Sequence, residues 1–248
     1  MPLATFRFYD ETNDFLPARL RGKTIEHPFD WKASIKDMIE SLGVPHCEME
    51  AIILNGTSIQ FDQIVPENAK IEVYGKLESC PIRPVLPLRE PLIGKPRFVL
   101  DTHLGRLASF LRMAGYDTLY RNDYDDSELA EVSNAEQRIL LTRDVGLLKR
   151  SLVIYGRFIR QTDPKRQLVE VLHRYHLIEE VSLLQRCLKC NGTLEAVEKQ
   201  AILSELTEST ARYYDEFHRC TACQQIYWKG SHYDRMVEFM TSVLDGAR

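Results

Sequence analysis

Residues 97–101, Arg97-Phe98-Val99-Leu100-Asp101, place an aspartate directly after a short apolar run. A run of this kind is typical of a strand buried inside a parallel sheet. Similar runs recur further along the chain, at Thr118-Leu119-Tyr120, at Ile139-Leu140-Leu141-Thr142 and within residues 153–160. Helical patterns separate them, and this alternation predicts an α/β domain built on an open parallel sheet with flanking helices.

The segments between the predicted strands have apolar residues at helical spacing. The first set would lie on one face of a helix that ends near Gly115: Leu104, Leu107, Ala108 and Leu111. Further helices are expected near residues 128–137, 145–150 and 164–175, the last opened by Pro164.

An acidic residue follows each of the four predicted strands. In chain order these residues are Asp101; Asp123, Asp125 and Asp126; Asp144; and Asp163. The carboxyl ends of parallel strands lie along one edge of a sheet, so we expect these side chains to converge there. Clustered carboxylates repel one another unless hard divalent cations bind between them. The pattern therefore predicts a Mg²⁺ or Mn²⁺ centre that hydrolyses phosphodiester bonds.

Helix capping is the competing interpretation of the same acids. Asp163 precedes Pro164 and is a good N-cap, and one of Asp125 and Asp126 is expected to cap the next helix, with Ser127 as a rival. Asp101 and Asp144 could also cap helices, although an acid directly at the end of a buried strand favours a functional role. Convergence of at least three carboxylates would favour catalysis, and separate helix ends would favour capping.

Two cysteine pairs lie near the C-terminal end, Cys187-Leu188-Lys189-Cys190 and Cys220-Thr221-Ala222-Cys223. Four thiolates in two such pairs suit a tetrahedral Zn²⁺ whose ligands all come from the protein, which is a structural site. The intervening residues 191–219 are more than a compact zinc ribbon needs. Cys47 and Cys80 are interpreted as ordinary thiols.

Residues 98–108, Phe98-Val99-Leu100-Asp101-Thr102-His103-Leu104-Gly105-Arg106-Leu107-Ala108, and residues 111–118, Leu111-Arg112-Met113-Ala114-Gly115-Tyr116-Asp117-Thr118, resemble the opening of the Mut-seven C-terminal ribonuclease domain, a PIN-like fold. Residues 138–144, Arg138-Ile139-Leu140-Leu141-Thr142-Arg143-Asp144, resemble its second landmark. The resemblance covers about residues 97–235, cysteines included. It implies single-stranded RNA as substrate and Mg²⁺ or Mn²⁺ as cofactor.

By motif match, the resemblance gives the metal-binding role first to Asp101 and Asp144. Which of the three acids at 123, 125 and 126 holds the family position stays open, and Asp163 matches least. The family commonly has methionine where His103 stands, so His103 is interpreted as a surface residue at a helix start.

Several basic residues are candidates for RNA binding near the acidic edge and after the second cysteine pair. They are Arg106, Arg112, Arg143, Lys149, Lys229 and His232. Lys229 and His232 alternate with aromatic residues, an arrangement that can meet phosphates and stack on bases. The aromatics Tyr227 and Trp228 are expected to pack the ribbon onto the main sheet.

The chain before residue 97 has a different character. Residues 77–96 contain five of the eleven prolines and are expected to form an extended linker or a wrapping arm between two domains. In residues 1–76, strands are expected near 5–9, 19–26, 52–54 and 71–74, a helix over 35–42 capped by Ser34, and a hairpin turn at Asn55-Gly56. This α+β unit resembles the ubiquitin-like β-grasp domain that often precedes the ribonuclease domain. The small sulfur carriers of this fold act through a free C-terminal Gly-Gly, whereas here the chain continues after Tyr74-Gly75-Lys76, so sulfur carriage is not expected. Binding of a protein or RNA, or structural support of the catalytic domain, are the remaining roles.

The composition fits a globular protein, with 44% hydrophobic and 27% charged residues. A net charge of −4 gives no indication of a nucleic-acid partner, so binding to RNA would require a local basic surface. The sequence has no run of eighteen apolar residues, so no membrane-spanning helix is expected. Its first residues lack the basic and then apolar pattern of a secretory signal, and we therefore expect a cytoplasmic protein without a membrane partner.

These observations predict four segments: a ubiquitin-like domain at 1–76, a linker at 77–96, a PIN-like domain at 97–180, and a zinc ribbon with a C-terminal helix at 181–248. The predicted function is metal-dependent hydrolysis of single-stranded RNA. The alternatives are a non-catalytic module that binds RNA or the ribosome through the zinc ribbon and basic helices, and a protein-interaction scaffold built on residues 1–76.

Overall fold

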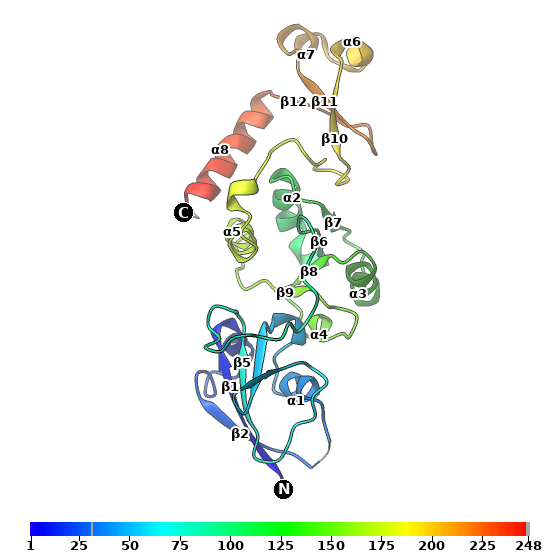
Figure 1. Ribbon diagram of the computed structural model, residues 1–248. Helices are drawn as coiled ribbons and strands as arrows, with labels where there is room; N and C mark the ends of the chain where they lie inside the picture. Colours follow the sequence, from blue (N-terminus) through cyan, green and yellow to red (C-terminus); the bar gives the residue numbers. More distant parts are fainter. Residues whose placement is uncertain (31, 247–248) are drawn as a thin grey trace.

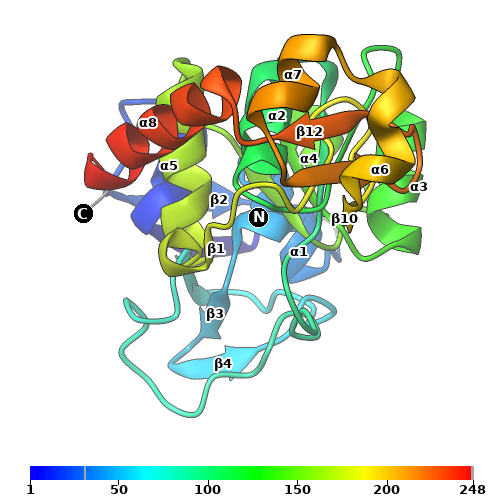
Figure 2. The same cartoon turned by 90° about the horizontal axis from the view of Figure 1, so that it is seen from above.

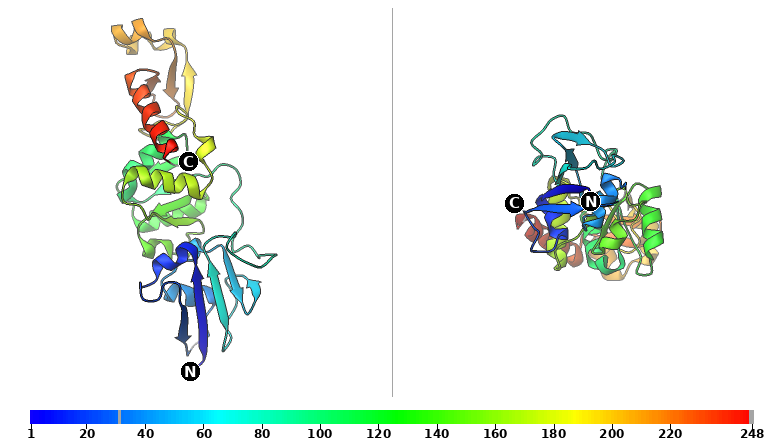
Figure 3. Two further views of the ribbon diagram at one scale, coloured as in Figure 1. Left: turned by 90° about the vertical axis from the view of Figure 1, so that its left-hand side faces the viewer. Right: turned by 90° about the horizontal axis from the view of Figure 1, so that it is seen from below.

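The computed structural model describes residues 1–30 and 32–246, and these form three tiers along one axis (Figure 1). The N-terminal domain occupies one end, a parallel-sheet domain the middle, and a cysteine-bearing module the other end. Figure 3 shows the same elongated arrangement from the side.

The N-terminal domain is a five-stranded sheet in the order β2-β1-β5-β3-β4. Its strands are β1 (Leu3–Tyr9), β2 (Thr24–Pro28), β3 (Ala51–Leu54), β4 (Thr57–Ile59) and β5 (Lys70–Tyr74). The central pair β1 and β5 is parallel and the other pairs are antiparallel. Helix α1 (Ile35–Ser41) and the short 3-10 helices η1 (Asp10–Phe15) and η2 (His46–Glu48) complete this β-grasp domain.

Local sequence signals account for two of its turns. The Ser34 hydroxyl accepts a hydrogen bond from the Asp37 amide and caps α1, as predicted. Asn55 and Gly56 have φ of 49° and 85° and join β3 to β4 in a two-residue hairpin, which is also confirmed. The strand expected at residues 19–26 was misplaced: β2 runs from Thr24 to Pro28, because residues 18–22 form turns.

The proline-rich connector, residues 77–96, contains no helix or strand among the described residues. It is nevertheless fixed to both neighbours. Arg89 donates to the Met49 carbonyl of the N-terminal domain, and Tyr155 of the middle domain donates to the Glu90 carbonyl. The connector is therefore a strap across the junction and not a free tether.

The middle domain holds a fully parallel sheet in the order β7-β6-β8-β9. The strands are β6 (Phe98–Leu100), β7 (Thr118–Tyr120), β8 (Ile139–Thr142) and β9 (Gly156–Phe158). All four strands predicted from the sequence are confirmed, with β9 shorter than expected.

Helices cover both faces of this sheet, because the side chains of a strand alternate between its faces. Phe98 and Leu100 pack under α2 (Gly105–Met113) and α5 (Pro164–Arg174), whereas Val99 packs with α3 (Asp126–Ala135) and α4 (Val145–Leu148). The 3-10 helices η3 (Thr102–Leu104) and η4 (Ile178–Glu180) flank α2 and α5.

The C-terminal module is an antiparallel sheet of three strands, β10 (Leu194–Val197), β11 (Phe217–Cys220) and β12 (Ile226–Trp228). Helix α8 (Ser231–Asp245) then returns to the middle domain, where Met240 and Val243 join its core beside α5 (Figure 2). Among residues 1–30 and 32–246, no helix combines the length and hydropathy needed to cross a membrane.

The N-terminal and middle domains are joined by buried ion pairs. The Glu48 side chain is 0% exposed and lies 2.8 Å from Arg157 and 3.2 Å from Arg160. Asp14 pairs with Arg160 at 2.7 Å, and Cys47 packs against the core of the middle domain. Because each charge has an opposite charge beside it, the junction stabilises one relative position of the two domains.

Replacing Glu48 with glutamine should destabilise the protein. The change keeps the side-chain shape but leaves the Arg157 guanidinium, 5% exposed, without its nearest counter-charge. We expect a loss of about 3 kcal/mol in the free energy of unfolding, measured by urea denaturation followed by circular dichroism. Glu67→Gln, at an exposed position, should change it by less than about 0.5 kcal/mol. Equal denaturation midpoints for the two variants would contradict this description of the junction.

Candidate active site and metal centre

Asp101 lies directly after β6 and is 7% exposed. Its Oδ2 accepts a hydrogen bond of 2.6 Å from the Thr142 hydroxyl, and its Oδ1 accepts one of 3.1 Å from the Thr102 hydroxyl. It occupies the N-cap position of η3, yet its side chain makes no capping hydrogen bond. The capping interpretation therefore does not account for this carboxylate.

The strand order puts Asp101 at a special place in the sheet. From β6 the chain crosses to β7 on one side, and β8 then pairs with the other side of β6. The connections after β6 and β8 thus run in opposite directions, and open parallel sheets bind ligands at the carboxyl ends of two such strands, the position called the crevice below. Asp101 follows β6 and Asp144 follows β8, so both belong to this crevice.

Thr142 connects the two acids. Its hydroxyl donates to Asp101 and accepts from the Asp144 amide at 2.9 Å, and the residue is fully buried. The Asp144 Oδ1 caps α4 by accepting from the amides of Gly146 and Leu147 at 2.6 and 3.3 Å. Asp144 is exposed, and its Oδ2 has no hydrogen bond within the described part of the chain.

Asp101 differs from the other enclosed carboxylates in its charge environment. Glu48 lies beside two arginines, and Asp117 lies 2.7 Å from Arg138. Burial alone would raise the pKa of Asp117, but hydrogen bonds from Arg138 and Asn191 hold it below the usual value. Among the residues that the structure describes, Asp101 forms no ion pair. A buried carboxylate without a cation is unfavourable, so this site fits a bound metal ion.

The remaining predicted acids lie elsewhere. Asp125 forms a capping box with Glu128 at the start of α3, and Asp163 caps α5 through the amides of Lys165 and Arg166. The exposed side chains of Asp123 and Asp126 face Arg121 and Arg150, at 2.9 and 3.9 Å.

The expected convergence of acids from four strand ends is not formed. Within residues 1–30 and 32–246, no three acidic side chains come within 4.8 Å of one another. The structure links only Asp101 and Asp144, through Thr142. Thr142 was missed by the sequence analysis, although a hydroxyl that ends the apolar run of β8 is a usable signal.

Three of the predicted RNA-binding side chains are engaged within the protein. Arg112 is buried and donates to the carbonyls of Thr118, Leu188 and Lys189, so it holds the first cysteine pair against α2. Lys149 donates to the Glu40 carbonyl of the N-terminal domain. Arg143 donates to three consecutive carbonyls after β9. The RNA-binding role predicted for Arg112 does not fit its buried position.

The other three candidates are exposed. Arg106 lies on the first turn of α2, close to Asp101 in the chain, and His232 lies at the start of α8. Lys229 pairs with Glu216 at 2.7 Å. Of these, Arg106 is the one nearest to Asp101 along the chain.

Gly105 allows the turn between η3 and α2 to approach β7 closely. A Cβ atom at this position would lie 2.6 Å from the Tyr120 hydroxyl oxygen. That hydroxyl donates to the Thr102 carbonyl at 2.9 Å and fixes the segment that follows Asp101. The glycine therefore helps to position the crevice wall.

The four predicted cysteines form one cluster. The ligand atoms of Cys187, Cys190, Cys220 and Cys223 all lie within 4.8 Å of one another. Two of the sulfur–sulfur distances are 3.6 and 3.4 Å. A tetrahedral Zn²⁺ with Zn–S bonds of about 2.3 Å needs sulfur atoms roughly 3.8 Å apart. The donor set and its spacing fit a closed structural zinc site.

Groups around the cluster favour a thiolate on Cys187, whereas burial raises the pKa of Cys190 to about 12. Burial alone would raise the pKa of Cys187, but hydrogen bonds from the Tyr227 hydroxyl and from backbone amides lower it to about 6. The same hydroxyl accepts from the Leu188 amide at 3.1 Å. Tyr227 thus acts beside the metal ligands, and not only as a packing residue.

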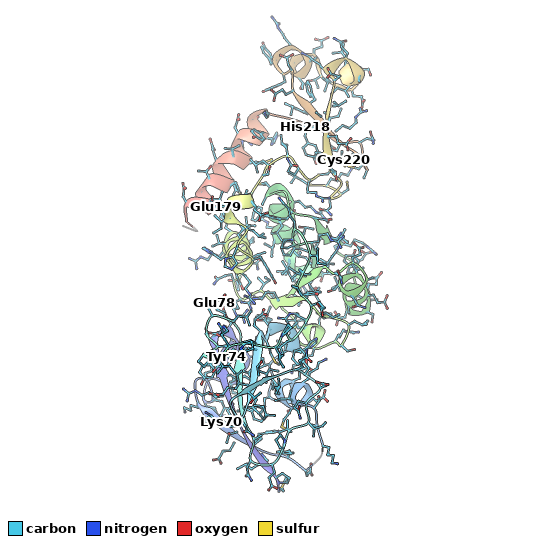
Figure 4. All side chains as sticks on the ribbon, viewed as in Figure 1. Lys70, Tyr74, Glu78, Glu179, His218 and Cys220 are labelled. Atoms are coloured by element: carbon cyan, nitrogen blue, oxygen red, sulfur yellow. The ribbon has the colours of Figure 1, made fainter. Side chains whose placement is uncertain are left out.

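The long interval between the cysteine pairs has a structural explanation. Helices α6 (Lys199–Ile202) and α7 (Glu208–Tyr213), with the 3-10 helix η5 (Leu203–Glu205), are inserted between β10 and β11. Figure 4 places the labelled Cys220 and His218 in this outer module, beyond α2. The cysteine cluster is therefore remote from Asp101 and does not form part of the crevice.

Comparison with known proteins gives two matches. Residues 96–240 match the model of the Mut7-C RNAse domain, and residues 1–80 match that of the Mut7-C ubiquitin family. No curated protein and no solved structure matches the chain.

Zinc binding should depend on the cysteine cluster alone. We expect one zinc per chain by elemental analysis, and its loss in Cys220→Ser together with a lower melting temperature, because the β-hairpins of the module have a small apolar core. Cys80→Ala, at a buried thiol of the connector, should keep the full zinc content. Undiminished zinc in Cys220→Ser would refute the assignment.

Proposed function

The chain belongs to the Mut7-C RNAse domain family, and on that premise we propose that it is a metal-dependent ribonuclease that hydrolyses single-stranded RNA at the crevice between β6 and β8. One observation carries the proposal. Asp101 holds a buried carboxylate at the sheet's switch point, caps no helix with its side chain and, among the described residues, pairs with no cation. A bound Mg²⁺ or Mn²⁺ would compensate this charge.

The residues of the crevice would hold a cation rather than react themselves. Asp101 offers two oxygens whose orientation is set by the hydroxyls of Thr102 and Thr142. Asp144 offers Oδ2, because its Oδ1 is occupied by the amides of α4. When bound, the cation supplies activation of water and stabilisation of the charge that develops on the phosphate.

The chain's basic residues would position the substrate. Arg106 lies exposed on α2, one turn beyond the crevice, where it can bind a phosphate of the RNA backbone. Arg143 fixes the segments after β8 and β9 by its three carbonyl contacts and would preserve the shape of the crevice. With a net charge of −4, the protein would then bind short, unpaired segments through such local contacts.

The rival function is an RNA-binding module without catalysis. Asp125 and Asp163 favour it, because both are accounted for as helix caps. The absence of three converging carboxylates among the described residues favours it as well, whereas it gives no reason for the burial of Asp101, which supports the catalytic proposal.

Removing the Asp101 charge should abolish RNA cleavage. We expect Asp101→Asn to reduce Mn²⁺-dependent cleavage of a fluorescently labelled, unstructured RNA by at least about a hundredfold, since the ion would lose its principal ligand. Asp215→Asn, at an 89% exposed side chain of the outer module, is the matched control and should keep full activity. Equal rates for wild type and Asp101→Asn, in preparations purified identically, would remove the proposed centre.

The Thr142 hydroxyl should affect metal binding and cleavage indirectly, because it orients Asp101 and Asp144. Thr142→Val removes it at nearly constant volume, and we expect Mn²⁺ affinity or cleavage to fall by about ten- to a hundredfold. Thr142→Ser retains the hydroxyl and should recover most of the activity. The readout is cleavage rate against Mn²⁺ concentration, in which the valine variant should need more metal. A valine variant with unchanged metal dependence would show that the hydroxyl only fills space.

A further inference from the structure

The loop between η1 and β2, residues 17–23, is strongly basic and is called the basic loop below. Its positive side chains are Arg19, Arg21 and Lys23, and it contains no acid. All three are exposed, and none forms an ion pair within the described part of the chain. Because the whole chain has a net charge of −4, three unpaired cations in five residues make a distinct local basic surface.

The basic loop has a fixed shape, because it is bonded to η1. Arg21 and Gly22 donate hydrogen bonds of 2.8 to 3.0 Å to three acceptors in or next to η1, which are the carbonyls of Asp14 and Leu16 and the Asn13 side chain. The side chains of Arg19 and Lys23 make no hydrogen bond with the described residues. These two cations are therefore held on an ordered loop and stay available to a ligand.

Helix η1 in turn packs at the carboxyl end of β9. Asp14 pairs with Arg160 at 2.7 Å, and the same guanidinium donates to the Glu11 carbonyl at 3.2 Å. The Phe15 ring meets the Phe158 ring edge-on, with 5.6 Å between the centroids. Strand β9 ends at Phe158, and Figure 1 shows the N-terminal domain directly next to β9 and α4. The basic loop therefore lies beside the sheet edge that carries the crevice.

Arginines of the middle domain connect the crevice to this loop. Arg143 precedes Asp144 and donates to the carbonyls of residues 159–161, so it reaches from the end of β8 to the end of β9. Arg160 follows, and its partner Asp14 accepts from Arg21 through the backbone carbonyl. Asp14, the acid within this row, is neutralised by Arg160. Positive groups thus continue from the crevice across β9 onto the N-terminal domain.

We propose that the basic loop binds the phosphate backbone of the RNA strand that occupies the crevice, so that the N-terminal domain forms part of the substrate-binding surface. The identity of this ligand rests on the proposed function. A single strand carries one negative charge per nucleotide, and a row of cations that begins at the crevice matches such a chain of charges. Phosphate contacts position a strand without reading its bases, so the loop would bind RNA of any sequence.

Fluorescence anisotropy with a labelled, unstructured RNA of about sixteen nucleotides tests this surface. All proteins carry Asp101→Asn, so that the RNA stays intact. Adding Arg19→Gln and Lys23→Gln together should weaken binding about tenfold at about 50 mM KCl. The slope of log K against log salt should become shallower by about 1.4, since each phosphate contact to a single strand contributes about 0.7.

The matched control combines Lys32→Gln and Lys36→Gln, which remove the same charge from the same domain, before and on α1. It should keep both the affinity and the salt slope of the parent. A control that loses as much affinity as the loop variant would show an effect of net charge alone and would overturn the proposal.

Amide hydrogen exchange on the parent protein gives a readout that needs no loop variant. Bound RNA should slow exchange in residues 17–23 as well as near residues 101–106. The proposal is overturned if exchange in the basic loop is unchanged by bound RNA, or if the loop variant keeps the parent's salt slope, as it would if the loop served an acidic protein. In both cases RNA still binds and the proposed function stands, whereas a parent that binds no RNA would remove both.

Discussion

The buried carboxylate of Asp101 is the constraint on which the functional account depends. The strand order places it there. Strands β6 and β8 are neighbours, but the chain continues from β6 to β7 on one side and from β8 to β9 on the other. Hydroxyl groups hold it, and no positive side chain among the described residues neutralises it. A protein that buries a charge in this way normally supplies a cation, and in the proposed function a divalent ion from solution would take that role.

Elsewhere the chain neutralises its buried acids with arginine, and these pairs join the three tiers. Glu48 of the N-terminal domain pairs with Arg157 and Arg160 of the middle domain. Asp117, just before β7, accepts hydrogen bonds from Arg138 and from Asn191. Asn191 belongs to the cysteine module and also accepts from the Thr118 amide at 2.8 Å. The cysteine module is thus bonded to β7 directly, so that its folding supports the sheet that carries Asp101.

Local signals in the sequence predicted much of this molecule. The apolar runs of β6 and β8, the Ser34 cap, the Asn55-Gly56 turn and the cysteine pairs are each decided by neighbours in the chain. The destinations of the acids and arginines were less predictable. Asp125 and Asp163 became caps, and Arg112 became a buried link, because such roles depend on which distant carbonyls and amides the fold brings near.

The most direct measurement is the anomalous diffraction of crystals grown with Mn²⁺. We expect a manganese peak within coordinating distance of the Asp101 carboxylate, on the side that faces Asp144, and no such peak in crystals of an isosteric amide variant. An Asp101 carboxylate that remains bonded only to Thr102 and Thr142 at saturating Mn²⁺, with the metal bound elsewhere, would contradict the proposed centre.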